Sequence, residues 1–334
     1  MNQSNFCYQN AFSFQSHGYR MGVATGYSLT SISAVSLNTL VFFTIWKTST
    51  LHKPSYILLA NLALTDLLVG AIVQPMTVMI NIAALKNWNK LFCLLSATSR
   101  VVGYWLGSVS LFTLTLISVD RLLAINLKNR YRTTVSLERV IRTLVFWWLK
   151  ALVVTVLNIF MNSNGESSNL LFIVPAVIIC SLLAVITVCY ALSFHTLRKL
   201  SKPVVKVTTG ERVAAKNADP KLPTIPENYT FDVCKYRRSL KTMLLVFISI
   251  LIFYLPYLCV VIAMAFRFTE KWMEDDAGLF HVKLLVLSEL LVILISTTNP
   301  VIYLWRVKDF RKASIKKLKE FLKLESNEII ELDS

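Results

Sequence analysis

Long apolar runs with almost no charge recur along the chain and alternate with short polar segments. Seven of these runs reach the length of about 20 residues that a helix needs to cross the hydrocarbon core of a bilayer. Because the bilayer interior cannot hydrogen-bond a bare backbone, each run is predicted to be a helix. The predicted spans are residues 23–46, 54–85, 101–119, 143–161, 170–196, 242–266 and 284–305. The pattern therefore predicts an all-α fold, a seven-transmembrane helix bundle.

Composition supports a membrane protein. Hydrophobic residues make up 55% of the chain and charged residues 16%, whereas a soluble domain has roughly 45–50% and ~25%. The net charge of +16 is compatible with a nucleic-acid partner, but the cations lie between the spans. Attraction to the anionic lipids of the inner leaflet accounts for the positive charge. We therefore expect membrane lipid, and no nucleic acid, as a partner.

The placement of Lys and Arg predicts the orientation. Most of the 35 cations fall in residues 47–53, 121–142, 198–241 and 306–323, all on one side of the predicted membrane. The cytoplasmic side carries the excess of cations. The N-terminus is therefore expected outside the cell and the C-terminus in the cytoplasm.

These assignments divide the chain into four parts. Residues 1–22 form an extracellular N-terminus and residues 23–305 the bundle, whose inner loop 199–240, with four prolines, is expected to be flexible. Residues 306–324 form an amphipathic helix and residues 325–334 a cytoplasmic tail. In the sequon that begins at Asn2, Asn2 is the outward glycosylation candidate.

The segment after the seventh span has the pattern of an amphipathic eighth helix on the inner leaflet. Its apolar or small residues share one helical face, and its cations lie mostly off that face. A helix of a soluble tail is the alternative, but the position directly after a span favours the membrane surface. The shared face consists of Phe310, Ala313, Ser314, Leu318, Phe321 and Leu322.

Charges inside the spans are the first functional candidates, because they are costly in lipid. Asp66 is either a buried carboxylate satisfied by neighbouring hydroxyl groups or a cation or proton site shared with Ser110, Ser296 and Asn299. Lys150 has two interpretations, snorkelling to the interface or pairing within the bundle.

Arg100 and Glu289 lie in the outer half of the predicted bundle. They either meet an acid or an amine of a ligand or pair with each other.

Two further features suit a molecular switch. Asp120 and Arg121 are adjacent opposite charges at the inner end of the third span, where they can pair. Pro256 and Pro300 each remove a backbone donor and kink a span, and Asn299 is expected to satisfy the groups that the Pro300 kink frees. A kinked helix can pivot between two packings, although each proline is also compatible with a tolerated membrane proline.

From about residue 25 to residue 322 the chain resembles the rhodopsin-like (class A) G-protein-coupled receptors. No single motif is specific for this family, but the occurrence of all of them in order on the predicted spans is specific. The motifs are Asn38; Leu62-Ala63-Leu64-Thr65-Asp66; Trp88 followed by Phe92-Cys93; Asp120-Arg121-Leu122; Trp148; Tyr190; Asn299-Pro300-Val301-Ile302-Tyr303; and Phe310.

The resemblance implies a plasma-membrane receptor, not an enzyme, that is activated by an extracellular ligand and signals to a heterotrimeric G protein. It implies no cofactor other than a candidate allosteric sodium ion at Asp66, Ser110, Ser296 and Asn299. The residues implied in coupling and switching are Asp120, Arg121, Tyr190, Tyr254, Pro256, Asn299, Pro300 and Tyr303.

Departures from the family pattern bear on the ligand. Gly103 stands where amine receptors carry an anchoring Asp, and Ile293 stands where light sensors carry a retinal-binding Lys. Neither a biogenic amine nor retinal is therefore expected, and other small-molecule ligands, peptides, nucleosides and lipids remain candidates. Arg100, Gly103 and Glu289 are the ligand-pocket candidates. Tyr254 replaces the usual switch Trp.

The second outer loop is short and contains no cysteine, so Cys93 lacks the partner that it has in the family. A Cys7–Cys93 disulfide and a free Cys93 are both open. The short loop resembles that of melanocortin-type receptors and their adenosine and lipid relatives.

A seven-span transporter or channel is the rival class. Few charges lie within the spans and no internal repeat is evident, which argues against it.

Overall fold

The computed structural model describes residues 16–163, 170–214, 227–267, 276–306 and 310–320, and these contain helices and no strand. Short turns η1 (Ser49–Leu51), η3 (Lys128–Arg130) and α6 (Tyr131–Thr134) connect longer elements. Seven helical spans are long and apolar enough to cross a membrane. They are built from α2 (His17–Lys47), α3 (Pro54–Leu68) continued by η2 (Val69–Val73) and α4 (Gln74–Leu85), α5 (Asn89–Leu127), α7 (Leu137–Ser163), α8 (Leu170–Ala214), α9 (Glu227–Arg267) and α10 (Asp276–Arg306). The predicted seven-helix bundle is confirmed.

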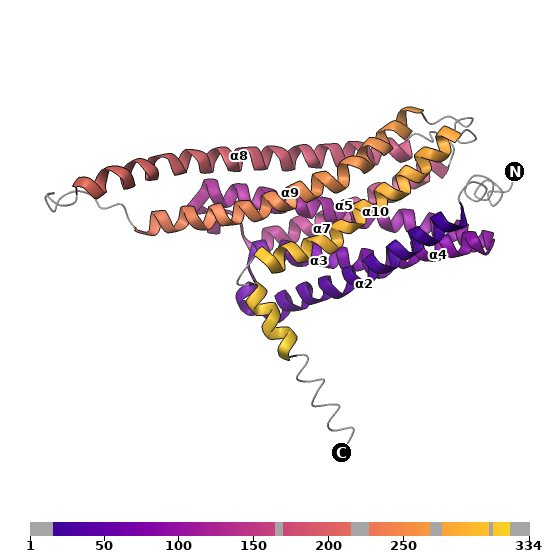
Figure 1. The fold of residues 1–334 in the computed structure, drawn as a ribbon, viewed down its shortest axis with the longest axis horizontal. Helices are drawn as coiled ribbons and strands as arrows, with labels where there is room; N and C mark the ends of the chain where they lie inside the picture. Colours follow the sequence, from indigo (N-terminus) through magenta and orange to yellow (C-terminus); the bar gives the residue numbers. More distant parts are fainter. Residues whose placement is uncertain (1–15, 164–169, 215–226, 268–275, 307–309, 321–334) are drawn as a thin grey trace, which may run out of the picture.

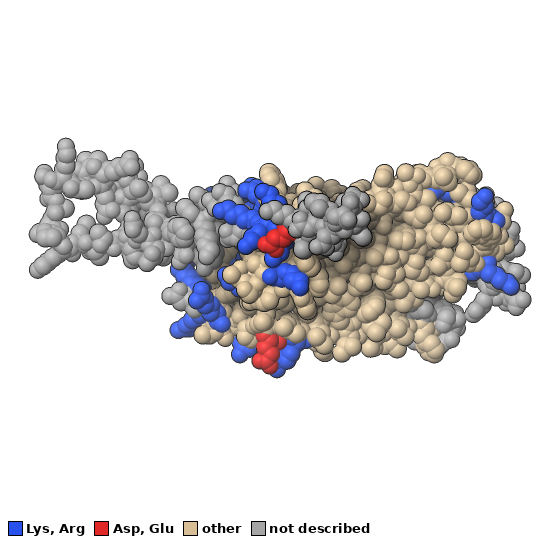
Figure 2. Space-filling view, turned by 90° about the horizontal axis from the view of Figure 1, so that it is seen from below, with Lys and Arg blue, Asp and Glu red and all other residues tan. Residues whose placement is uncertain are grey.

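The helices run roughly along one common direction, and the C-terminal part of α8 and the N-terminal part of α9 extend side by side beyond the rest of the bundle (Figure 1). On the face seen in Figure 2, Lys and Arg gather toward the two ends of the bundle, and a broad belt between them shows no charged side chain. Such a belt matches the hydrocarbon layer of a bilayer. The chain is therefore a multi-pass membrane protein.

Most helices extend beyond the predicted spans; α5, for example, covers Asn89–Leu127 where residues 101–119 were predicted. The first helix begins at His17, inside the segment 1–22 that was assigned to the N-terminus. Helix α8 continues to Ala214 and α9 begins at Glu227, so much of the segment 199–240 that was expected to be a loop is helical. The physical reason is that an established helix gains one hydrogen bond for each residue added, which polar composition does not prevent.

The second span contains a wide π-helical turn, η2, directly before Gln74 and Pro75. Proline has no N–H, and helices accommodate such residues through local changes of winding. Gly70 in this turn is pressed against α2: a Cβ atom there would lie 3.0 Å from Cβ of Ala34 and 3.3 Å from the backbone nitrogen of Val35. The Ser31 hydroxyl donates a 2.8 Å hydrogen bond to the Gly70 carbonyl oxygen. The turn therefore joins spans one and two closely.

Residues 310–320 form a further helix after α10. Phe310 is 1% exposed and belongs to the main hydrophobic core, and Ser314 is also buried. Ile315 and Leu318 are exposed. The predicted helix of residues 306–324 thus exists over its described part, and its first turn packs against the bundle. Phe321, Leu322 and the tail 325–334 lie outside the described residues, and placement on the inner leaflet stays a prediction.

Candidate functional site

The buried carboxylate of Asp66 is held by the residues that were predicted to share a site with it. Ser296 donates a 2.8 Å hydrogen bond to Oδ1, and Nδ2 of Asn299 donates one of 3.2 Å to Oδ2. The Ser110 hydroxyl also lies beside this carboxyl group. Asp66 is only 2% exposed. Spans two, three and seven therefore meet at one polar centre in the bundle.

The carbonyl oxygen that Pro300 leaves without a backbone donor is bound by a residue that was not predicted for this role. Without a nitrogen-bound hydrogen, Pro300 cannot donate to the carbonyl oxygen of Ser296, four residues earlier. Nδ2 of Asn38 donates to that oxygen instead, at 2.7 Å. Asn299 was expected to satisfy the freed group, but its amide nitrogen serves Asp66. That expectation is therefore wrong, and the first span supplies the missing donor.

A second polar link joins spans two, three and four. The indole nitrogen of Trp148 donates a 3.0 Å hydrogen bond to Oδ1 of Asn61. The amide nitrogen of Asn61 donates to the Thr113 hydroxyl at 2.8 Å. The ring of Trp105 packs edge-on against Trp148, with 5.4 Å between their centroids. The amide of Asn61 thus fixes the position of α7 against the centre of the bundle.

Near the C-terminal end of α5, Asp120 and Arg121 form the predicted ion pair, with Nη2 and Oδ2 3.0 Å apart. Asp120 is 4% exposed. Ser55 donates to Oδ2 at 2.9 Å and the Tyr131 hydroxyl to Oδ1 at 2.5 Å. Burial raises the pKa of Tyr131 to about 12, and its hydrogen bond to Asp120 acts in the same direction. Tyr131 therefore remains a neutral donor at physiological pH.

Sequence reasoning missed Ser55 and Tyr131 because both lie outside the motif. Ser55 lies at the start of span two and Tyr131 in the short α6, and no sequence motif marks either position. Only the tertiary structure brings them to Asp120.

Three buried tyrosines, Tyr190, Tyr254 and Tyr303, belong to the main hydrophobic core. The ring of Tyr190 stacks on Phe247, with 4.8 Å between centroids. Tyr190 and Tyr303 both lie near Arg121, and the Tyr303 hydroxyl has no hydrogen-bond partner among the described residues. Tyr254 is 6% exposed and lies two residues before Pro256 in α9. The role of these tyrosines in switching stays a prediction.

A cavity of about 500 Å³ opens among α4, α5, α7, α8, α9 and α10. Cavities of this size hold small ligands. The lining includes all three predicted pocket residues, Arg100, Gly103 and Glu289, together with Tyr254. Asp66, Ser110 and Ser296 also line it, so the cavity reaches the polar centre of the bundle.

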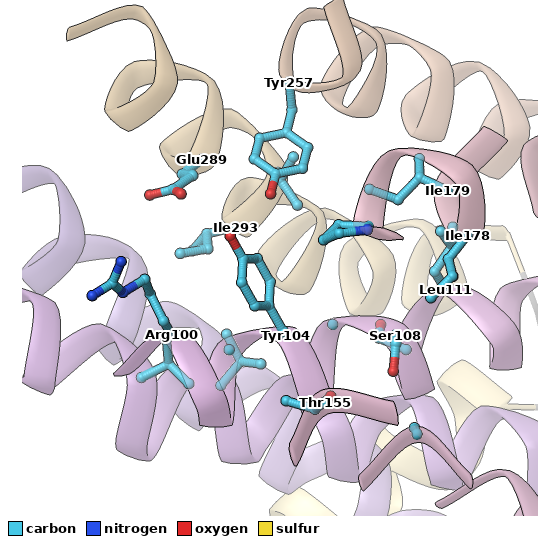
Figure 3. A pocket seen from close by; sticks show the side chains of 18 of the residues that line it. Arg100, Tyr104, Ser108, Leu111, Thr155, Ile178, Ile179, Tyr257, Glu289 and Ile293 are labelled. Atoms are coloured by element: carbon cyan, nitrogen blue, oxygen red, sulfur yellow. The ribbon is translucent and has the colours of Figure 1, made fainter. Parts of the chain in front are cut away.

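Figure 3 shows Arg100 and Glu289 at one end of this cavity, and the hydroxyls of Tyr104 and Tyr257 facing each other in its middle. Arg100 and Glu289 do not form an ion pair: the pairs among the described residues are those of Arg121, Arg142 and Lys317. Of the two interpretations of these charges, direct pairing is therefore not observed. Both side chains are open to a ligand.

Lys150 also lines the cavity. Its ammonium group lies 4.7 Å from the centroid of the Trp147 ring. It forms no ion pair within the described part of the bundle. Of the two predictions for Lys150, pairing with an acidic side chain is not observed there.

Cys93 is in a disulfide bond. Its proposed partner, Cys7, and the glycosylation candidate Asn2 lie outside the described residues. The question of a free Cys93 is therefore answered, whereas the identity of the partner stays a prediction.

Comparison with known proteins agrees with this architecture. The family model described as "7 transmembrane receptor (rhodopsin family)" matches residues 37–303. The trace amine-associated receptor 7c of Rattus norvegicus is 24% identical, over 92% of this chain and 86% of that receptor. The histamine H2 receptor of Cavia porcellus is 26% identical, over 45% of this chain and 42% of that receptor.

Further histamine H2 receptors match over similar parts, so the chain spans less than half the length of the first relatives it resembles. The family consists of receptors rather than enzymes. The match covers the bundle from the first span to Tyr303 and includes each motif between these points. The chain therefore belongs to the rhodopsin family of seven-transmembrane, G-protein-coupled receptors.

Proposed function

We propose that the chain is a plasma-membrane receptor that binds an extracellular ligand in the 500 Å³ cavity and couples it to a heterotrimeric G protein. One observation carries the proposal: Asp66, Tyr254 and Ser296, which belong to the polar centre and the switch, also line the cavity. A ligand there touches the residues that would have to rearrange. The N-terminus is outside and the C-terminus inside, in keeping with the distribution of cations.

Activation is a shift between two packings of span six. A ligand changes that equilibrium only by the difference in its affinity for the two packings. Tyr254 and Tyr257 line the cavity on either side of Pro256, so contact with the ligand acts directly at the kink. Movement of α9 about Pro256 opens an inner cleft beside Arg121, Tyr190 and Tyr303.

The G protein is the partner that we assign to this inner cleft. Arg121 is 24% exposed and its charge is balanced by Asp120, so an incoming carbonyl or carboxylate group can replace that partner. The basic segments around the cleft attract acidic protein surfaces and anionic lipid headgroups.

The ligand class is narrowed by the charges of the cavity. The relatives named above are receptors for histamine and trace amines by name, but Gly103 leaves no carboxylate at the family's amine anchor. We therefore keep a biogenic amine as the less favoured class, and peptides, nucleosides and lipids as the favoured ones. Glu289 offers an acidic side chain to the ligand, and Arg100 offers a cationic one.

Sodium is proposed as an allosteric ion at Asp66. Carboxylate and hydroxyl oxygens are the ligands that hard cations prefer. Asp66, Ser110 and Ser296 supply such oxygens, and the buried amide oxygen of Asn299 has no hydrogen-bond partner in the described part of the chain. An ion that binds only the packing with this centre intact stabilises that packing.

The test is nucleotide exchange by purified G-protein heterotrimers in lipid nanodiscs, with pools of peptides, nucleosides and lipids as ligands. We expect exchange by the wild type with at least one heterotrimer and its loss in Arg121→Ala. Arg142→Ala is the matched control, because Arg142 is 69% exposed and pairs with Glu138 on the surface of α7. Solute flux in proteoliposomes without any G protein would instead support a transporter.

A further inference from the structure

We propose that Lys150 binds the acid group of an anionic single-chain amphiphile, a long-chain carboxylate, whose hydrocarbon tail occupies the α7–α8 end of the cavity. This inference rests on the proposed function in that it names a ligand class for the same cavity.

The position and contact of Lys150 argue against simple snorkelling to the nearer end of the span. It lies within the membrane span Leu137–Leu157, about 10 Å from the Leu157 end at ~1.5 Å per residue. Its ammonium group lies over Trp147, which is one helical turn further from that end. A lysine that reached for the nearer interface would extend in the opposite direction. The charge is therefore directed toward the middle of the span, and Lys150 is exposed where it borders the cavity.

The ammonium group is held there by an aromatic ring and by no anion. The Trp147 ring stacks flat on Phe112, with 3.7 Å between the centroids. Its indole nitrogen donates to the Ser108 carbonyl oxygen at 3.4 Å, so the ring is fixed. A cation over an aromatic face is stabilised, but an ammonium group has three donors. No described side chain within ion-pair distance neutralises it.

The walls of the cavity that Lys150 lines suit a hydrocarbon tail. Figure 3 shows Leu111, Ile178 and Ile179 together at the end of the cavity opposite Arg100 and Glu289. Val154 also lines the cavity, and Ser108 and Thr155 add hydroxyl groups. One cation beside mostly aliphatic walls matches a ligand with one acid group and an apolar chain.

Lys150 also borders the lipid-facing side of α7. Phe146, Leu149 and Val153 on that side are 65%, 61% and 56% exposed. Trp147, Ala151 and Val154 on the other side line the cavity. A carboxylate dissolved in the bilayer therefore meets Lys150 at the boundary between lipid and cavity.

The test measures binding of tritiated dodecanoic acid to the full chain in nanodiscs of uncharged phosphatidylcholine. We expect Lys150→Met to weaken binding about tenfold or more, which corresponds to ~1.4 kcal/mol or more. Lys150→Arg should retain binding, because it keeps the charge. Lys86→Met is the matched control, since Lys86 is exposed at the end of α4 and should leave binding unchanged. The methyl ester of dodecanoic acid should compete only weakly with the labelled acid for the wild type, because the ester lacks the acid group.

Equal binding by wild type and Lys150→Met, or equal competition by the ester, would overturn the proposal. Monodispersity on size exclusion checks that each variant is folded. Because no G protein is present, the result is separate from the receptor test. Binding that depends on Lys150 without nucleotide exchange would sink the proposed function alone, and exchange without such binding would sink this inference alone.

Discussion

The side-chain amide of Asn38 donates a 2.7 Å hydrogen bond to the carbonyl oxygen of Ser296, the acceptor that Pro300 leaves without a backbone partner. The same amide nitrogen donates to the Ala34 carbonyl oxygen at 2.9 Å. Asn38 is 1% exposed, so water cannot replace it. The geometry of the seventh span near its proline therefore depends on a residue of the first.

Replacing Asn38 by Ala should destabilise the protein by about 1–3 kcal/mol, the penalty for leaving a buried polar group without a partner. The measurement is thermal unfolding of the purified protein in detergent. Ser36→Ala is the control: Ser36 is exposed and its hydroxyl bonds only within its own helix. A melting temperature equal to that of the control would show that the Ser296 carbonyl group finds another donor.

Gly70→Ala should destabilise the protein by roughly 1–3 kcal/mol, the typical effect of overpacking. The new methyl group would meet both Ala34 and the Val35 backbone, and backbone cannot turn aside as a flexible side chain can. Gly22→Ala provides the comparison, because a Cβ atom there has nothing within 4 Å. We expect Gly22→Ala to be neutral or slightly stabilising in the same melting experiment. Similar melting temperatures for the two variants would contradict the close approach.

Tyr131→Phe should lower stability at neutral pH through loss of the hydrogen bond to Asp120. The pKa of Tyr131 is raised from its ordinary value of 10.0 to about 12, so the neutral hydroxyl is favoured in the folded protein. Its contribution is therefore fully present below about pH 10 and is lost as the pH rises toward 12. Melting curves of wild type and Tyr131→Phe between pH 7 and pH 11 should converge at the alkaline end. If the melting temperatures of wild type and Tyr131→Phe differed by the same amount over this whole pH range, the neutral Tyr131 hydroxyl would not be what stabilises the wild type.

Sodium chloride should raise the melting temperature of the wild type more than choline chloride at equal ionic strength. An ion that binds only the folded protein stabilises it by mass action. Asp66→Asn removes the carboxylate and should abolish the difference between the two salts. Glu138→Gln, which removes an exposed carboxylate of α7, should leave the difference intact. If sodium raised the melting temperature of wild type and of Asp66→Asn equally, a sodium site at Asp66 would be excluded.

Several of these features were predictable because they follow from hydropathy or from local motifs. The seven spans were predicted from the length and charge of the apolar runs. Asp66, Ser110, Ser296 and Asn299 were grouped correctly because each lies in or near a motif whose depth in the bundle is known. The ion pair of Asp120 and Arg121 follows from adjacency in the chain.

Other contacts were not predictable from this sequence alone. The bond from Asn38 to Ser296 joins residues far apart in the chain, and its direction depends on how α2 is rotated. Whether Lys150 faces lipid or the cavity likewise depends on the rotation of α7. The inner ends of α8 and α9 were assigned to a loop because polar composition does not distinguish a solvated helix from a coil.

The wide turn η2 determines how a change in chain length would alter the part of the cavity wall that α4 forms. Each residue of an α-helix advances the chain by about 100°, so insertion or deletion of one residue within Val69–Val73 would rotate α4 as a unit. Val73 and Thr77, which line the cavity, would then face elsewhere, while Asp66 and the rest of α3 kept their register. A single codon gained or lost there would thus change this wall of the cavity and leave the polar centre around Asp66 in place.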